Sequence, residues 1–200
     1  MKLLLKYNLV LVLLTLSTTV FAGEKDKVNI KYELPDGWYR AGSDPGKYDM
    51  GTDKGGAKDG SNCATIESNA KHIKGFGTLM QTSSPEKFKG KRVRMTGYMK
   101  SEHVDGWAGF WLRVDKKNGQ GSSAFDNMSK RPVKGNTEWT KYDIVLDVDE
   151  NAADIAYGAL LSGTGQIWFD KITFEIVDAT TPSTDIKVKK EEPVNLSFDE

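Results

Sequence analysis

Apolar residues between positions 23 and 177 alternate with polar residues at a period of two far more often than at helical spacing. Clusters of Gly, Asn, Asp and Lys separate the alternating segments, as they do between antiparallel strands. The pattern predicts ten strands, at residues 28–33, 47–51, 63–68, 75–82, 92–100, 107–115, 123–128, 140–148, 155–161 and 166–177. One helical turn is expected at residues 84–88, where Ser84 precedes Pro85. This spacing indicates an all-β fold, an antiparallel β-sandwich of the jelly-roll type.

The alternation divides each of the two central strands into a core face and an outer face. The predicted core positions are Val93, Met95, Gly97 and Met99 in the first strand and Ala108, Phe110, Leu112 and Val114 in the second. The outer face then carries Arg94 and Tyr98 on one strand and Trp107, Trp111 and Arg113 on the other. Two tryptophans with an arginine are unusual on a strand surface that faces solvent, so this face should be covered by something.

The sequence allows two explanations for what covers this aromatic face. Either a ligand binds the aromatic face, or the Gly-, Asp- and Lys-rich segment 42–61 or the C-terminal tail packs on it to form a second small core. The remaining tryptophans, Trp38, Trp139 and Trp168, are expected to be structural.

The chain divides into a leader, one domain and a tail. Residues 1–22 have the basic start, apolar centre and small-residue end of a cleavable signal peptide, and the apolar stretch is too short to span a membrane. We therefore expect an exported, periplasmic or extracellular protein without a membrane anchor after cleavage. Residues 23–178 form the β-sandwich domain. Residues 179–200 form a polar tail, in which residues 194–199 repeat the pattern of residues 28–33 and could form a terminal strand.

Charge and motifs exclude several function classes. Without the leader, 26 basic residues stand against 28 acidic ones, a formal charge of −2 that does not favour nucleic acid binding. Cys63 is the sole cysteine and is expected to pack in a strand. The sequence contains no hydrolase nucleophile elbow, P-loop or HExxH zinc motif. His72 and His103 lie in polar segments and are expected to be solvated. A non-enzymatic role follows, with a hydrolase that uses unrecognised carboxylates as the less favoured alternative.

Three segments resemble the galactose-binding-like jelly rolls of carbohydrate-binding modules. They are the strand opened by Trp139, the strand at residues 155–161, and the Gly-x-Gly turn at residues 163–165 that leads into Trp168-Phe169-Asp170. The opening segment with Pro35-Asp36-Gly37-Trp38 and the strand after Gly90-Lys91 are similar to the same superfamily, particularly to an uncharacterised group of secreted bacterial domains. The superfamily also includes assembly factors.

The resemblance implies a binding module for a carbohydrate or a similar polar ligand, with a protein partner as the alternative. Sugar rings stack on indoles while arginines and carboxylates bind hydroxyls. The expected ligand-binding residues are Trp107, Trp111, Arg94, Arg113, Tyr98, Asp126 and Asn127. No cofactor is required. Many members hold a structural calcium ion, for which Glu33 and Asp170 are the matching positions here. The alternative is an exposed Glu33 and an Asp170 that accepts turn amides.

Overall fold

The computed structural model describes residues 31–187, in which the regular secondary structure consists of β-strands and two short 3-10 turns. The strands are β1 (Tyr39–Gly42), β2 (Tyr48–Asp53), β3 (Cys63–Ser68), β4 (Phe76–Ser83), β5 (Lys91–Lys116), β6 (Ser122–Asp126), β7 (Val133–Val148), β8 (Ala152–Ser162) and β9 (Gln166–Val177), with two 3-10 turns, η1 (Pro45–Lys47) and η2 (Lys117–Gly119). The expected leader and the expected strand at residues 194–199 lie outside the described residues. Within residues 31–187, no helix has the length and apolar character needed to cross a membrane.

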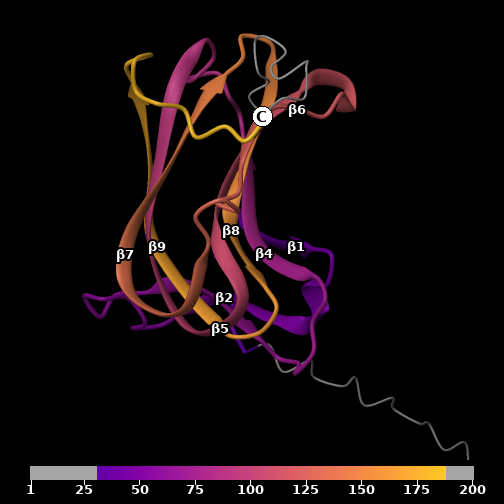
Figure 1. Ribbon diagram of the computed structural model, residues 1–200, viewed down its shortest axis with the longest axis vertical. Coiled ribbons are helices and arrows are strands. Elements are labelled where there is room, and N and C mark those ends of the chain that lie inside the picture. The colour runs from indigo at the N-terminus through magenta and orange to yellow at the C-terminus, as the bar shows by residue number, and fades with distance from the viewer. Residues whose placement is uncertain (1–30, 188–200) are drawn as a thin grey trace, which may run out of the picture.

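All strand pairs are antiparallel, and the long strand β5 belongs to two layers. Its first half, residues 91–102, pairs with β7 on one side and β9 on the other, and β3 and β2 continue that layer. Its second half, residues 107–116, pairs with β8 and β6, and β4 and β1 continue the other layer. Figure 1 shows β7 and β9 on the left, facing β8, β4 and β1 on the right. The predicted antiparallel β-sandwich is confirmed.

A β-bulge lies at the middle of β5, where the sequence pattern indicated a turn between two strands. Between Ser101 and Val104, three steps along β5 correspond to two steps along β7, from Thr137 to Gly135. His103 takes up the extra residue with φ at 53°, in the left-handed region. An odd number of added residues exchanges the two faces of a strand. Core positions are therefore odd-numbered before the bulge and even-numbered after it, and residues 92–100 and 107–115 are parts of one strand.

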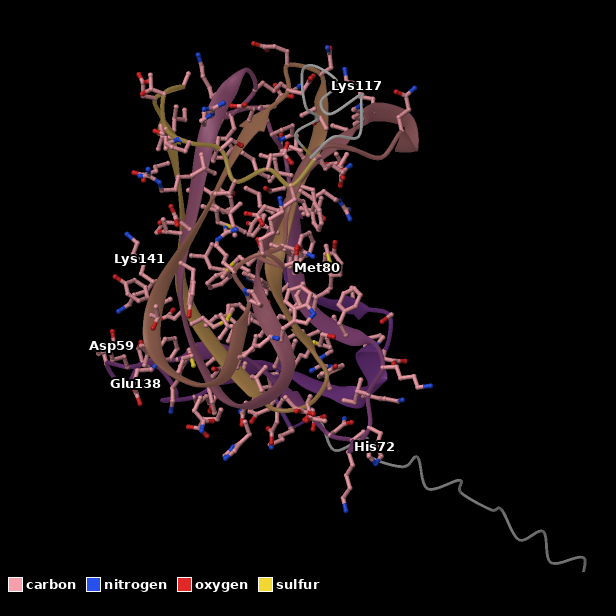
Figure 2. All side chains as sticks on the ribbon, viewed as in Figure 1. Asp59, His72, Met80, Lys117, Glu138 and Lys141 are labelled. Carbon is pink, nitrogen blue, oxygen red and sulfur yellow. The ribbon has the colours of Figure 1, made fainter. Side chains whose placement is uncertain are left out.

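The main core lies between the two layers, as the side chains in Figure 2 show. The predicted core positions of both halves of β5 are buried, among them Val93, Met95, Phe110 and Leu112. Phe110 packs edge-on against Phe169, and Trp38 packs against Phe169 and Tyr157. The structural role expected for Trp38 is confirmed.

The first part of the polar tail bridges the two layers. The Thr184 N–H donates to the Val145 carbonyl oxygen on β7 at 2.8 Å, and the Thr184 hydroxyl accepts the Val145 N–H at 3.0 Å. The next two residues contact β6: Ile186 donates its N–H to the Phe125 carbonyl oxygen, and the Asp185 carboxylate accepts the Phe125 N–H. These bonds satisfy backbone groups on strands from both layers, which otherwise would be open edges. The described part of the polar tail therefore pairs with strand edges.

Two local features differ from the sequence prediction, and one agrees with it. Strand β1 was not foreseen, because four residues do not display a periodicity. The single turn expected at residues 84–88 is present, because the N–H groups of Phe88 and Lys89 both donate to the Pro85 carbonyl oxygen. Glu33, expected in a regular first strand, makes an isolated bridge with Thr52.

Candidate functional site: an aromatic groove on the β1-β4-β8-β5-β6 layer

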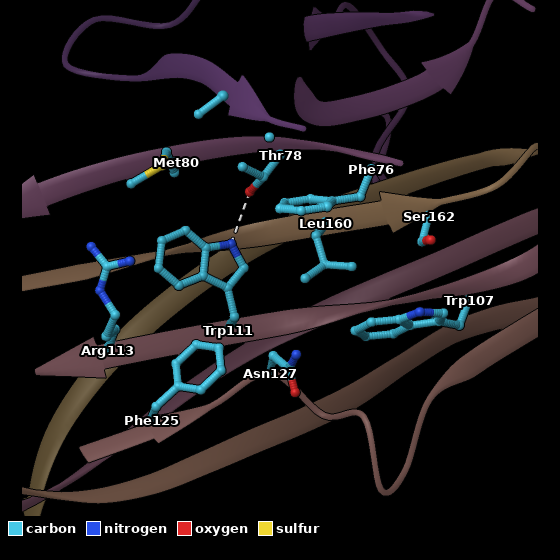
Figure 3. Close-up of a pocket in the computed structure, with 12 residues that line it drawn as sticks. Phe76, Thr78, Met80, Trp107, Trp111, Arg113, Phe125, Asn127, Leu160 and Ser162 are labelled. Atoms are coloured by element: carbon cyan, nitrogen blue, oxygen red, sulfur yellow. Dashed lines mark hydrogen bonds between the residues drawn. The ribbon is translucent and has the colours of Figure 1, made fainter. Parts of the chain in front are cut away.

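A cavity of about 370 Å³ opens on the outer face of the layer formed by β1, β4, β8, β5 and β6. We call it the aromatic groove. All five strands contribute to it, and most of its side chains are apolar or aromatic (Figure 3). The lining residues are Ala41, Gly42, Phe76, Thr78, Met80, Trp107, Trp111, Arg113, Phe125, Asn127, Leu160 and Ser162. The volume is within the range of small-molecule binding sites.

Strand alternation puts Trp107, Trp111 and Arg113 on one face of β5. Leu112, between Trp111 and Arg113, points into the main core instead. Because Trp107 and Trp111 are four residues apart on an extended strand, their Cα atoms are separated by about 13 Å. Figure 3 shows Leu160 between the two indoles and Arg113 beyond Trp111. The groove is therefore elongated along β5, with aromatic rings toward both ends.

Trp111 is held rigidly at the floor of the groove. It is only 6% exposed and packs with Met80, Ala156 and Leu160 in a small cluster separate from the main core. Its indole N–H donates to the Thr78 hydroxyl at 2.8 Å, and that hydroxyl donates in turn to the Ala159 carbonyl oxygen. Trp107 is half-buried at the edge of the same cluster. The sequence left open a second small core on this face, covered by segment 42–61 or by the tail. A second small core is present, but residues of β4, β5 and β8 form it, and its outer surface lines the aromatic groove.

Arg113 is oriented by a neighbour on its own strand. Its Nε donates to Asp115 Oδ1 at 2.6 Å and its Nη2 donates to Asp115 Oδ2 at 2.9 Å. The guanidinium also lies 5.8 Å from the centre of the Trp111 ring. A two-bond pairing of this kind fixes the plane of the guanidinium.

Asn127 reaches the groove from the end of β6. Its side-chain oxygen accepts the Ser129 N–H at 3.1 Å, in a turn closed by the side chain. This bond identifies the oxygen and leaves the side-chain amide N–H groups without a hydrogen bond in the described residues.

The other expected site residues are not in the groove. Arg94 and Tyr98 are on the first half of β5, in the other layer, where Arg94 pairs with Glu175 and Asp143. Tyr98 borders a separate small pocket with Trp139. Asp126 is fully buried; it accepts the Met128 N–H and pairs with Arg131 at 2.7 Å. The structure thus brings together Trp107, Trp111, Arg113 and Asn127, and separates Arg94, Tyr98 and Asp126 from them.

Sequence reasoning missed several groove residues, chiefly Phe76, Met80, Phe125 and Leu160. Phe125 could have been found, because alternation along β6 puts residues 125 and 127 on one face and Asp126 on the other. The sequence pattern does not reveal that β8 pairs with β5 or that β4 pairs with β8. Only this strand order places Phe76, Met80 and Leu160 in the groove.

Glu33 and Asp170 are too far apart to share an ion. Glu33 pairs with Thr52, Thr52 with Ala64, and Ala64 with Phe169, the residue before Asp170. Three strand spacings separate them, or about 14 Å. Calcium ligands lie within about 2.6 Å of the ion. The Glu33 carboxylate pairs instead with Lys54, and Asp170 accepts the Lys171 N–H. In the described part of the chain, no three His, Cys, Asp or Glu side chains gather into a metal-binding group.

The comparison with family models finds no match. The chain is 39% identical over 184 residues to the "Uncharacterized HTH-type transcriptional regulator YbfP" of Bacillus subtilis (strain 168). The match covers 90% of this chain but 62% of the regulator's length. No α-helix occurs in residues 31–187, so the described residues do not contain the helix-turn-helix of that protein's name.

Solved structures with this fold include binding modules. The CBM22-1 xylan-binding domain of Paenibacillus barcinonensis Xyn10C superposes with a TM-score of 0.52 at 14% identity, covering 75% of this chain and 92% of that domain. A putative sugar binding protein from Bacteroides thetaiotaomicron VPI-5482 has a TM-score of 0.51 at 14% identity, covering 74% of this chain and 90% of that one.

Enzymes share the fold as well. A Stig cyclase from Fischerella sp. TAU, solved with an indole compound, gives a TM-score of 0.50 at 12% identity, covering 77% of this chain and 92% of the cyclase. At these identities the likeness concerns the fold alone. The chain has the β-sandwich of the carbohydrate-binding modules.

Proposed function

We propose that this protein is an exported, non-catalytic binding module that holds a saccharide in the aromatic groove. The observation that carries the proposal is the position of Trp107 and Trp111 on one face of β5, with Arg113 and Asn127 beside them. The apolar faces of sugar rings stack on indoles, and the guanidinium and amide groups bind sugar oxygens. The fold shared with carbohydrate-binding modules supports the same ligand class.

The length of the groove favours an oligosaccharide over a single sugar. A ligand that touches both indoles must extend over about 13 Å, and one that also reaches Arg113 must be longer still. Trp111, which is buried and hydrogen-bonded, would provide a fixed surface. Trp107, which is half-buried, would provide the exposed contact.

The side chains of the groove argue for binding without catalysis. Its twelve lining residues include no Asp, Glu, His, Cys or Lys, which are the side chains most often used as general acids or bases. The hydroxyl of Thr78 is occupied by Trp111 and the Ala159 carbonyl oxygen. Export through the leader at residues 1–22 would bring such a module to extracellular glycans.

A second candidate is an effector-binding domain of a longer regulatory protein. The relative from B. subtilis favours it, because this chain matches 62% of a protein named as a transcriptional regulator. The groove would then bind the effector, and the ligand chemistry would be the same.

A glycan array, followed by calorimetric titration of the purified protein with any retained oligosaccharide, tests the saccharide proposal. We expect saturable binding that Trp107→Ala weakens at least tenfold. The matched control is Trp139→Ala, which removes a half-buried tryptophan from the other layer and should leave affinity unchanged. Retention of no glycan, or equal affinity in wild type and Trp107→Ala, would contradict the proposal. Capture of a defined protein in place of glycans would favour the protein-partner alternative, and turnover of a bound glycan would overturn the non-catalytic role.

A further inference from the structure

We infer that the aromatic groove selects acidic saccharides, and that Arg113 receives the carboxylate of a uronic acid residue. This inference deepens the proposed function and rests on it. It concerns which sugars bind, whereas the proposed function requires only that some sugar does.

Several polar atoms of the groove already have hydrogen-bond partners. The Trp111 N–H and the Thr78 hydroxyl are bonded to each other, and the Asn127 oxygen is bonded to the Ser129 N–H. The groups left for a ligand are Arg113 Nη1, the Trp107 indole N–H, the Asn127 amide N–H groups and the Ser162 hydroxyl, whose contact to the Gly75 carbonyl oxygen is long at 3.4 Å. Nearly all of them donate hydrogen bonds.

A neutral sugar presents hydroxyl groups that donate as well as accept, and each buried donor needs an acceptor. The groove offers few, because its lining contains no carboxylate and its amide oxygen is already used. A carboxylate only accepts hydrogen bonds. An acidic sugar therefore matches the free donors better than its neutral counterpart does.

Arg113 is the only charged residue among the twelve that line the groove. The Asp115 carboxylate accepts hydrogen bonds from Nε and Nη2 of Arg113 and so fixes the plane of the guanidinium. Within the described residues, Nη1 makes no hydrogen bond. Arginine with one edge fixed by a carboxylate can still bind a second carboxylate through the remaining nitrogens. Its position beyond Trp111 suits a charged group on a ring stacked against that indole.

The test titrates the protein with pairs of oligosaccharides that differ only in the carboxylate. Tetragalacturonate, oligomannuronate and a glucuronic-acid-bearing xylo-oligosaccharide are each compared with their carboxyl-reduced forms. We expect at least one acidic member to bind about tenfold tighter than its reduced form, since hydrogen bonds to charged groups are worth more than neutral ones. The preference should shrink at high ionic strength.

Three variants separate specificity from folding. R113Q should lower the affinity for the acidic oligosaccharide far more than the affinity for its reduced form, so that the acidic preference disappears, and R113K, which keeps the charge without the planar fork, should retain part of the preference. The matched control is R94Q, an arginine paired with carboxylates on the other layer, which should keep the full preference. Unfolding midpoints of all variants establish that each is folded.

The outcomes distinguish the two proposals. If glycans bind but every reduced form binds as tightly as its acidic partner, the inference is overturned and the proposed function stands. If no sugar binds, both fall. If acetate and benzoate at the same concentration bind as tightly as the acidic oligosaccharides, the groove recognises carboxylates in general and selection of a saccharide is overturned. A preference that persists in R113Q also overturns the inference.

Discussion

Trp111 donates its indole N–H to the hydroxyl of Thr78, 2.8 Å away on β4. The two residues lie in strands that do not pair directly, since β8 runs between β4 and β5. The Thr78 hydroxyl donates onward to the Ala159 carbonyl oxygen on that intervening strand. This chain of two hydrogen bonds fixes the ring that forms the floor of the aromatic groove.

Replacement of Thr78 by valine keeps the shape of the side chain and removes its hydroxyl. The buried indole N–H then lacks an acceptor, and we expect a loss of about 2 kcal/mol in the free energy of unfolding. Urea unfolding measures it. Thr140→Val, at an exposed position on β7, is the control and should cost only a few tenths of that. In a Trp111→Phe background the Thr78→Val cost should shrink, and full additivity would contradict the coupling.

The Asp126–Arg131 pair supports β6 from the core side. Asp126 is fully buried, and Arg131 also donates to the Asp143 carbonyl oxygen. Arg131→Met should leave a buried carboxylate without its cation and destabilise the fold by about 3 kcal/mol. Arg94→Met is the control, because its carboxylate partners are more than half exposed and such pairs contribute about 1 kcal/mol or less. Equal losses in the two variants would show that burial of Asp126 is not decisive.

The pairing of Arg92 with Asp147 predicts a pH dependence. The hydrogen bonds from Arg92 lower the pKa of Asp147 below its ordinary value. A lowered folded-state pKa gives a stability contribution that is complete above the unfolded pKa of about 3.9, and that is lost as pH falls through the folded pKa. We therefore expect Asp147→Asn to be less stable than wild type at neutral pH, with a difference that narrows below about pH 4. Because Asp147 is 62% exposed, the difference should be small. Chemical unfolding at several pH values measures it, and a gap that widens in acid would show the sign to be wrong.

Cys63 should be chemically inert in the folded protein. It is a buried free thiol, and burial, assisted by Asp53 and Asp170, raises its pKa to about 12. Thiolate is the reactive form, so iodoacetamide should modify Cys63 only after denaturant is added. Mass spectrometry of native and unfolded samples distinguishes the two cases. Rapid labelling of the native protein would mean that the thiol is more accessible than its surroundings indicate.

Much of the strand content was readable from the sequence because β-strands have a simple period. Strands β3 and β9 have the predicted bounds, and the core positions of β5 follow the predicted alternation on both sides of His103. The bulge itself was not readable. The segment around His103 has the composition of a turn, but His103 adopts a left-handed conformation within a continuous strand of 26 residues.

Only part of the aromatic groove was predictable from the sequence, because periodicity describes one strand at a time. Periodicity by itself determined that Trp107, Trp111 and Arg113 share a face, because neighbours two apart on a strand always do. It did not determine which other strands lie beside them. Hydrogen bonds between strands form among residues distant in the sequence, and only the tertiary structure decided that Phe76, Met80 and Leu160 complete the groove, that Arg94 and Tyr98 belong to the other layer, and that Asp126 faces the core.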